Sequence, residues 1–158
     1  MFRSLKVGMG FGLTSATITT LGLIIGLESS TSSKLAIIGG ILTIAIADSC
    51  SDALGVHIAK EAEGNFSNIE VWQATFFTFL FKAVFACSFL IPILLLPLHT
   101  AIITALFWGT VILLFQSYEL AKSEKVNPLG VIREHLLIAT FVMIATHFAG
   151  VWISNTFK

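Results

Sequence analysis

The sequence predicts an all-α integral membrane protein, folded as a bundle of five transmembrane helices. Of the 158 residues, 56% are hydrophobic and 11% are charged, and the mean hydropathy is +0.93. This composition is far more apolar than that of an ordinary soluble domain. The apolar residues also group into runs of about 20 residues, the length that crosses a bilayer core.

Five such runs lie at roughly 7–27, 35–59, 72–96, 99–120 and 133–154. They use nearly the whole chain, so we expect residues 1–158 to form a single domain. The basic residues near the run ends divide six to two between the two sides, with Lys158 on the poorer side. By the positive-inside rule, this places the N-terminus in the cytoplasm and the C-terminus outside or in a lumen.

The first run carries a stripe of small and hydroxylated residues on one helix face. Its members are Gly8, Gly12, Ser15, Thr19, Gly22 and Gly26. Two interpretations are open, since either another helix packs closely against the stripe or a polar pathway runs along it. Ser15 and Thr19 are candidate pathway residues, and Lys82 in the third run is another.

The second run places two aspartates where water is scarce. Asp48 and Asp52 are four residues apart and therefore project from one helix face. A carboxylate at mid-bilayer costs about 2.5 to 3.5 kcal/mol and normally faces a protein interior or a wet cavity. Together the two could bind one divalent cation with water molecules, or hold one proton between them.

Lys82 in the third run offers a purely structural explanation. Asp48 and Lys82 both lie about 16 Å of helical rise from the cytoplasmic side. A buried pair between them would satisfy both charges without any transport function. Asp52 would then lack an internal partner, which makes it the strongest functional candidate. We expect Pro92, further along this run, to kink or end the helix.

Three further candidates lie near the cytoplasmic end of the second run. His57 could ligate a metal ion, or be a hydrogen-bonded residue at the rim. Glu61 and Glu63 could attract cations to an entrance, or form an ordinary solvated helix end. His57 and Glu61 share the helix face opposite to Asp48 and Asp52, so we do not expect all of them in one site within a subunit.

The sequence gives no support for an enzyme, a bound cofactor or a nucleic-acid partner. It contains no recognisable nucleophile–base arrangement, glycine-rich phosphate loop or Cys-x-x-Cys pair. The formal net charge is zero, whereas binding to a phosphate backbone requires an excess of lysine and arginine.

The stretch FGLTSATITTLGLIIGL in the first run resembles the first span of the vacuolar iron transporter family. The matching residues are Phe11, Gly12, Thr19, Thr20, Leu21, Gly22, Leu23 and Gly26. The stretch CSDALGVHIAKEAE is similar to the Ser-Met-Ala-x-Gly-Glu-Tyr stretch of that family, through Ser51, Ala53 and Gly55. Pro92 and the stretch ATHFAGVWIS extend the resemblance over nearly the whole chain.

This resemblance implies a homodimer in a lipid bilayer, with a metal pathway between the subunits. The implied activity is export of divalent iron or manganese from the cytoplasm in exchange for protons. Four functional positions depart from the family pattern: Ser15 replaces an Asp, Asp52 replaces a Met, Val56 replaces a Glu and His57 replaces a Tyr. The cytosolic metal-collecting domain of the family is also reduced to about a dozen residues, too few for a helical domain.

A change of position can restore the cation site. Ser15 and Asp52 lie about 12 Å and 10 Å of helical rise from the cytoplasmic ends of their helices. The carboxylate that the family carries at the position of Ser15 is therefore replaced, at the same depth, by the carboxylate of Asp52 on the neighbouring helix. Two Asp52 side chains could then share one ion across a twofold axis. The alternative is a non-transporting membrane scaffold or accessory subunit that keeps the transporter fold.

Overall fold

The computed structural model describes residues 2–157, and all regular structure in that part of the chain is helical. The predicted all-α fold is confirmed. Met1 and Lys158 lie outside the described residues, so the part of the orientation count that rests on Lys158 has no structural counterpart. The elements are α1 (Phe2–Thr31), α2 (Lys34–Thr43), the π-helical turn η1 (Ile44–Asp48), α3 (Ser49–Glu63), α4 (Asn68–Ser88), α5 (Leu90–Leu95), α6 (Leu98–Glu124) and α7 (Pro128–Thr156).

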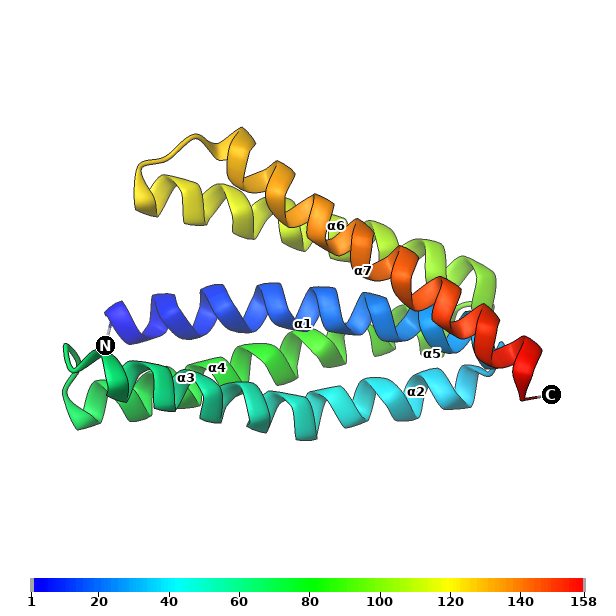
Figure 1. Cartoon of the computed structure of the whole chain (residues 1–158), viewed down its shortest axis with the longest axis horizontal. Helices are drawn as coiled ribbons and strands as arrows, with labels where there is room; N and C mark the ends of the chain where they lie inside the picture. Colours follow the sequence, from blue (N-terminus) through cyan, green and yellow to red (C-terminus); the bar gives the residue numbers. More distant parts are fainter. Residues whose placement is uncertain (1, 158) are drawn as a thin grey trace.

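Five helical stretches within residues 2–157 are long and apolar enough to cross a membrane. They are α1, α2 continued through η1 into α3, α4 continued into α5, α6 and α7. Each corresponds to one predicted run, and most continue several residues beyond it. Figure 1 shows the two ends of the chain at opposite ends of the bundle, as an odd number of spans requires.

The connection between α1 and α2 is shorter than predicted. The polar stretch 28–34 reads as a loop in the sequence, but α1 continues to Thr31. The Thr31 hydroxyl donates to the carbonyl of Leu27 at 2.7 Å, since a short hydroxyl side chain can bond to a carbonyl one turn back in its own helix. The Ser33 side chain then accepts a backbone N–H in the first turn of α2.

The second membrane stretch is not one regular helix. Between α2 and α3, Ile44–Asp48 forms the π-helical turn η1, and the hydroxyl of Ser49 donates to the carbonyl of Ile44 at 3.2 Å. One extra residue in a turn rotates the following helix by about 100° around its axis. The turn therefore sets the direction in which α3 presents its side chains. Helix α3 ends at Glu63, before Gly64, whose φ of 66° lies in the left-handed region that favours glycine.

Proline interrupts the third membrane stretch, as predicted. Helix α4 ends at Ser88 and α5 begins at Leu90. Because Pro92 has no backbone N–H, the carbonyl of Ser88 loses its usual partner four residues later. The regular helix is broken at this point.

Helix α1 is the central element and packs against α2, α4, α6 and α7 (Figure 1). Its small-residue stripe serves two different neighbours. A Cβ at Gly8 would lie 2.7 Å from backbone atoms of α4, whereas a Cβ at Gly26 would lie 3.5 Å from Thr146 of α7. At its glycines the stripe is therefore a packing face, as the first interpretation proposed.

Candidate functional site

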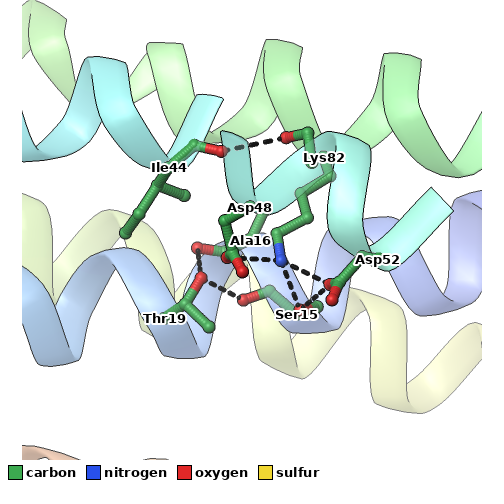
Figure 2. A network of polar contacts seen from close by, with 8 residues as sticks. Ser15, Ala16, Thr19, Ile44, Asp48, Asp52 and Lys82 are labelled. Atoms are coloured by element: carbon green, nitrogen blue, oxygen red, sulfur yellow. Dashed lines mark hydrogen bonds and ion pairs between the residues drawn. The ribbon is translucent and has the colours of Figure 1, made fainter. Parts of the chain in front are cut away.

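The side chain of Lys82 on α4 is fully buried, and its ammonium lies at the centre of a polar cluster. Nζ lies 2.5 Å from Oδ2 of Asp48, pairs with Oδ2 of Asp52 and donates to the Ser15 hydroxyl at 3.0 Å. Three oxygen atoms surround this ammonium: the contacts to Ser15 and Asp52 are hydrogen bonds, and the contact to Asp48 is an ion pair. Figure 2 shows the groups converging on Nζ. We call Ser15, Asp48, Asp52 and Lys82 the carboxylate–lysine cluster.

Ser15 on α1 connects the two kinds of charge in this cluster. Its hydroxyl donates to Oδ2 of Asp52 at 2.6 Å, while its oxygen accepts from Lys82. Thr19 lies one turn further along α1 and donates to the backbone carbonyl of Ser15 at 2.8 Å (Figure 2). The contact confirms that Ser15 and Asp52 lie at the same depth in the bundle.

Lys82 has more partners than the sequence predicts. The predicted pair between Asp48 and Lys82 is present. The expectation that Asp52 lacks an internal partner is wrong, because the same ammonium also reaches the next turn of α3. Asp48 and Asp52 lie on one helix face, so one lysine from α4 contacts both.

Close packing of α1 against α4 brings the cluster together. A Cβ at Gly12 would lie 3.1 Å from the backbone nitrogen of Lys82 and 3.0 Å from the carbonyl of Thr78. Because Gly12 has no side chain, the backbones of the two helices approach closely at this level. Ser15, three residues later on α1, is thereby held within hydrogen-bonding reach of both charged partners.

The carboxylate–lysine cluster is buried at its lysine and partly exposed at its carboxylates. The side chain of Lys82 has no exposed surface, whereas those of Asp52 and Asp48 are 22% and 38% exposed. Two carboxylates and one ammonium carry a formal charge of −1 together. The negative side of the cluster thus lies on a face that the chain leaves partly uncovered, where a cation or a second subunit can approach.

The other predicted site residues lie apart from the cluster. His57 shares a hydrogen bond of 2.9 Å with the hydroxyl of Thr75 on α4, as a rim histidine does. Glu61 is exposed, and Glu63 pairs with Lys60 at 2.5 Å. Within residues 2–157, no three His, Cys, Asp or Glu side chains are placed to hold a metal ion together. Within the described residues, the carboxylate–lysine cluster thus brings two carboxylates together.

A cavity of about 650 Å³ opens at the end of the bundle that carries the N-terminus, and it reaches Ser15. Its walls come from α1, α3, α6, α7 and Phe66, which follows α3. They include the basic side chains of Arg3, Lys6 and Lys60. Sequence reasoning did not find this cavity, because its lining residues are spread from position 3 to position 135. A wall of this charge opposes the entry of a metal cation.

No protein-family model, no curated protein and no solved structure matches this chain. The resemblance to the vacuolar iron transporter family therefore stays a prediction that rests on the motif residues. Within residues 2–157, all regular structure is helical, with five apolar stretches of membrane length. Three of these stretches contribute residues to the carboxylate–lysine cluster.

Proposed function

We propose that this chain is a membrane carrier for divalent cations of the iron and manganese type, which it exports in exchange for protons. The main support is that two carboxylates of one helix face already meet around one positive charge, that of Lys82. Carboxylate and hydroxyl oxygens are ligands that hard divalent cations accept. In this proposal, the Lys82 ammonium occupies the place of the ion between transport events.

The charges of the cluster give proton exchange a physical basis. With Lys82 protonated, the cluster carries a formal charge of −1. A divalent ion between Asp48 and Asp52 would raise this charge to +1 deep in the bilayer, which is costly. Release of the Lys82 proton returns the cluster to zero. Binding of one ion is therefore favoured when one proton leaves, as is general for metal sites that need deprotonated groups.

A second copy of the chain fits this proposal. A bare stripe of small residues follows α2, η1 and α3 at four-residue spacing, and every member is exposed: Gly39, Thr43, Ala47, Ser51, Gly55 and Ala59. A Cβ at Gly39 or Gly55 would have no neighbour within 4 Å. Such stripes are common contact faces between membrane helices. A twofold dimer on this face would cover the exposed carboxylates and let the Asp52 side chains of both subunits share one ion.

The C-terminal end of α3 fits an entrance on the same side as the N-terminus of the chain. Glu61 and Glu63 are exposed there. Glu63 is paired with Lys60, so in this proposal Glu61 is the main charge that raises the local concentration of cations before the ion reaches Asp52. His57 serves in this account as a rim residue, because it lies apart from the carboxylate–lysine cluster and its Nδ1 shares a hydrogen bond with Thr75.

Flux into proteoliposomes tests the proposal. Wild-type protein is expected to move Fe²⁺ and Mn²⁺ with opposite movement of protons, read by an internal pH dye. Asp52→Asn keeps the side-chain shape but removes the charge, and we expect flux to fall roughly tenfold or more, since one contact to a charged group contributes about 1.5–3 kcal/mol. Glu134→Gln, an exposed position on α7, is the matched control.

The outcomes of this assay are distinct. Full flux in Asp52→Asn would remove Asp52 from the mechanism, and a comparable loss in Glu134→Gln would show that the effect is not specific to the cluster. If wild-type vesicles move Fe²⁺ and Mn²⁺ no faster than vesicles without protein, the carrier proposal as a whole is contradicted.

A non-transporting scaffold or accessory subunit is the second candidate. The observation that favours it is the complete burial of Lys82 among three oxygen partners, which is also what a structural charge network requires. If the chain is a scaffold, wild-type vesicles should show no more ion flux than vesicles without protein. Loss of Lys82 would still destabilise the fold. The wild-type flux alone therefore separates the two functions.

A further inference from the structure

A second cavity adjoins the basic one at the end of the bundle that carries the N-terminus. It has a volume of about 320 Å³ and lies between α1 and α6. Both cavities are lined by Lys6, Gly10, Leu120 and Ser123. The contact of 3.3 Å between the Lys6 ammonium and the Ser123 hydroxyl lies where they meet. We treat the two as one feature, the α1–α6 cavity.

The α1–α6 cavity has more positive than negative side chains. Four cationic residues line it against two acidic ones, and the set is Arg3, Lys6, Lys60, Lys122, Glu119 and Glu124. Glu63 engages Lys60, and the Arg3 guanidinium lies 3.8 Å from the centre of the Phe66 ring. Lys6 and Lys122 form no ion pair with any residue in 2–157. Two lysines are thus available to an anion, and the two glutamates of the cavity, Glu119 and Glu124, also form no ion pair within residues 2–157.

Gln116 gives this cavity a buried polar group without a partner. The residue is only 3% exposed, yet it lines the cavity and its Oε1 has no hydrogen-bond partner among the described residues. The side-chain amide of Gln116 lies next to Gly10, because a Cβ added at Gly10 would be 3.3 Å from Nε2 of Gln116. A buried acceptor left unpaired is costly, so such a group usually meets a donor. Because Oε1 is itself buried, the amide must turn about its last side-chain bond for a ligand hydroxyl or amine in the cavity to satisfy it.

We propose that the α1–α6 cavity binds the headgroup of an anionic phospholipid that carries a hydroxyl group, of the phosphatidylglycerol type. Lys6 and Lys122 would contact the phosphate, and Gln116 would accept the headgroup hydroxyl. The apolar walls formed by Val7, Met9 and Phe11 suit the glycerol backbone and the start of the acyl chains. Basic pockets between membrane helices near the cytoplasmic surface are suited to such headgroups. This inference does not depend on the proposed transport function.

Binding of defined lipids to the purified full chain tests the proposal. Native mass spectrometry and thermal unfolding in detergent would compare phosphatidylglycerol, phosphatidic acid, phosphatidylcholine and glycerol phosphate. We expect phosphatidylglycerol to bind and to raise Tm, and phosphatidylcholine and glycerol phosphate to have no effect. An equal rise in Tm with glycerol phosphate would assign the cavity to a free phosphate compound and overturn the lipid proposal.

Variants separate this site from general surface charge. Lys6→Gln and Lys122→Gln are each expected to weaken phosphatidylglycerol binding roughly fivefold. Lys125→Gln removes the same charge at the same end of the bundle but does not line the cavity, so it is expected to bind as wild type does. An equal loss in Lys125→Gln would contradict a defined site.

Gln116→Met tests the hydroxyl contact by itself. We expect it to weaken phosphatidylglycerol binding roughly two- to tenfold, the effect of one hydrogen bond, and to leave phosphatidic acid, which lacks the headgroup hydroxyl, unchanged. Unaltered discrimination between the two lipids in Gln116→Met would overturn the role of Gln116.

Discussion

Replacing Lys82 with methionine is expected to lower the free energy of unfolding by about 3–5 kcal/mol, the usual effect of removing one partner from a buried charge network. The substitution leaves Asp48 and Asp52 facing each other without the ammonium that now separates them. Methionine fills a similar volume, so the loss comes from the stranded carboxylates and not from a cavity. Denaturant unfolding in detergent micelles, with Lys122→Met as an exposed control, measures the effect.

Removing all three charges should restore most of this loss. In the triple variant Asp48→Asn, Asp52→Asn, Lys82→Met no uncompensated charge remains, and buried ion pairs can often be replaced by neutral groups at little cost. Equal stability of Lys82→Met and wild type would show that the ion pairs of Lys82 do not contribute to the free energy of unfolding. A triple variant no more stable than the single one would show that the destabilisation has another origin.

Adding one methyl group to α1 is expected to damage the fold, while the same change on α3 is not. A Cβ at Gly8 would lie 2.7 Å from backbone atoms of α4, and backbone cannot give way as a flexible side chain does. We expect Gly8→Ala to lose about 1–3 kcal/mol from overpacking. In the single chain, a Cβ at Gly55 meets nothing within 4 Å, so Gly55→Ala should gain up to about 1 kcal/mol from helix propensity when both variants are compared as monomers. Thermal unfolding of the two variants in detergent measures the contrast.

A larger side chain at Gly55 extends the comparison to the proposed dimer. Gly55→Leu should leave each subunit folded but block close approach of two α3 helices, so light scattering should show monomers where wild type shows dimers. A wild-type monomer, or a dimer unaffected by Gly55→Leu, would contradict a dimer on this stripe. Equal stabilities of Gly8→Ala and Gly55→Ala would contradict the close contact between α1 and α4.

The sequence predicts the helices well because hydropathy reports directly on membrane-length segments. All five runs are found as helices, and the breaks at Gly64 and near Pro92 are where glycine and proline place them. Helical rise also predicts the contact between Asp48 and Lys82, since two charges at equal depth in an apolar bundle have few other partners.

Other features of the site have no local signal in the sequence. Nothing in Ile44–Asp48 marks a π-helical turn, because none of these residues is a glycine or proline. The stripe on α1 predicts close packing, but it does not predict which helix packs where. Gly8 lies against α4, whereas Gly26 lies against α7. The sequence-based prediction gave Lys82 a single partner and so did not include its ion pair with Asp52. An ammonium has three donors and can satisfy several oxygen atoms at once.

Infrared difference spectroscopy of the carboxylates on addition of Mn²⁺ tests most directly whether Asp48 and Asp52 exchange the Lys82 ammonium for a divalent ion. Wild-type protein in lipid is expected to show a shift of the carboxylate stretching bands that a chelator reverses. Asp52→Asn should lose part of this shift, and the triple variant without the three charges should lose all of it. No shift in wild type at saturating Mn²⁺, or the same shift in the triple variant, would contradict cation binding at this cluster.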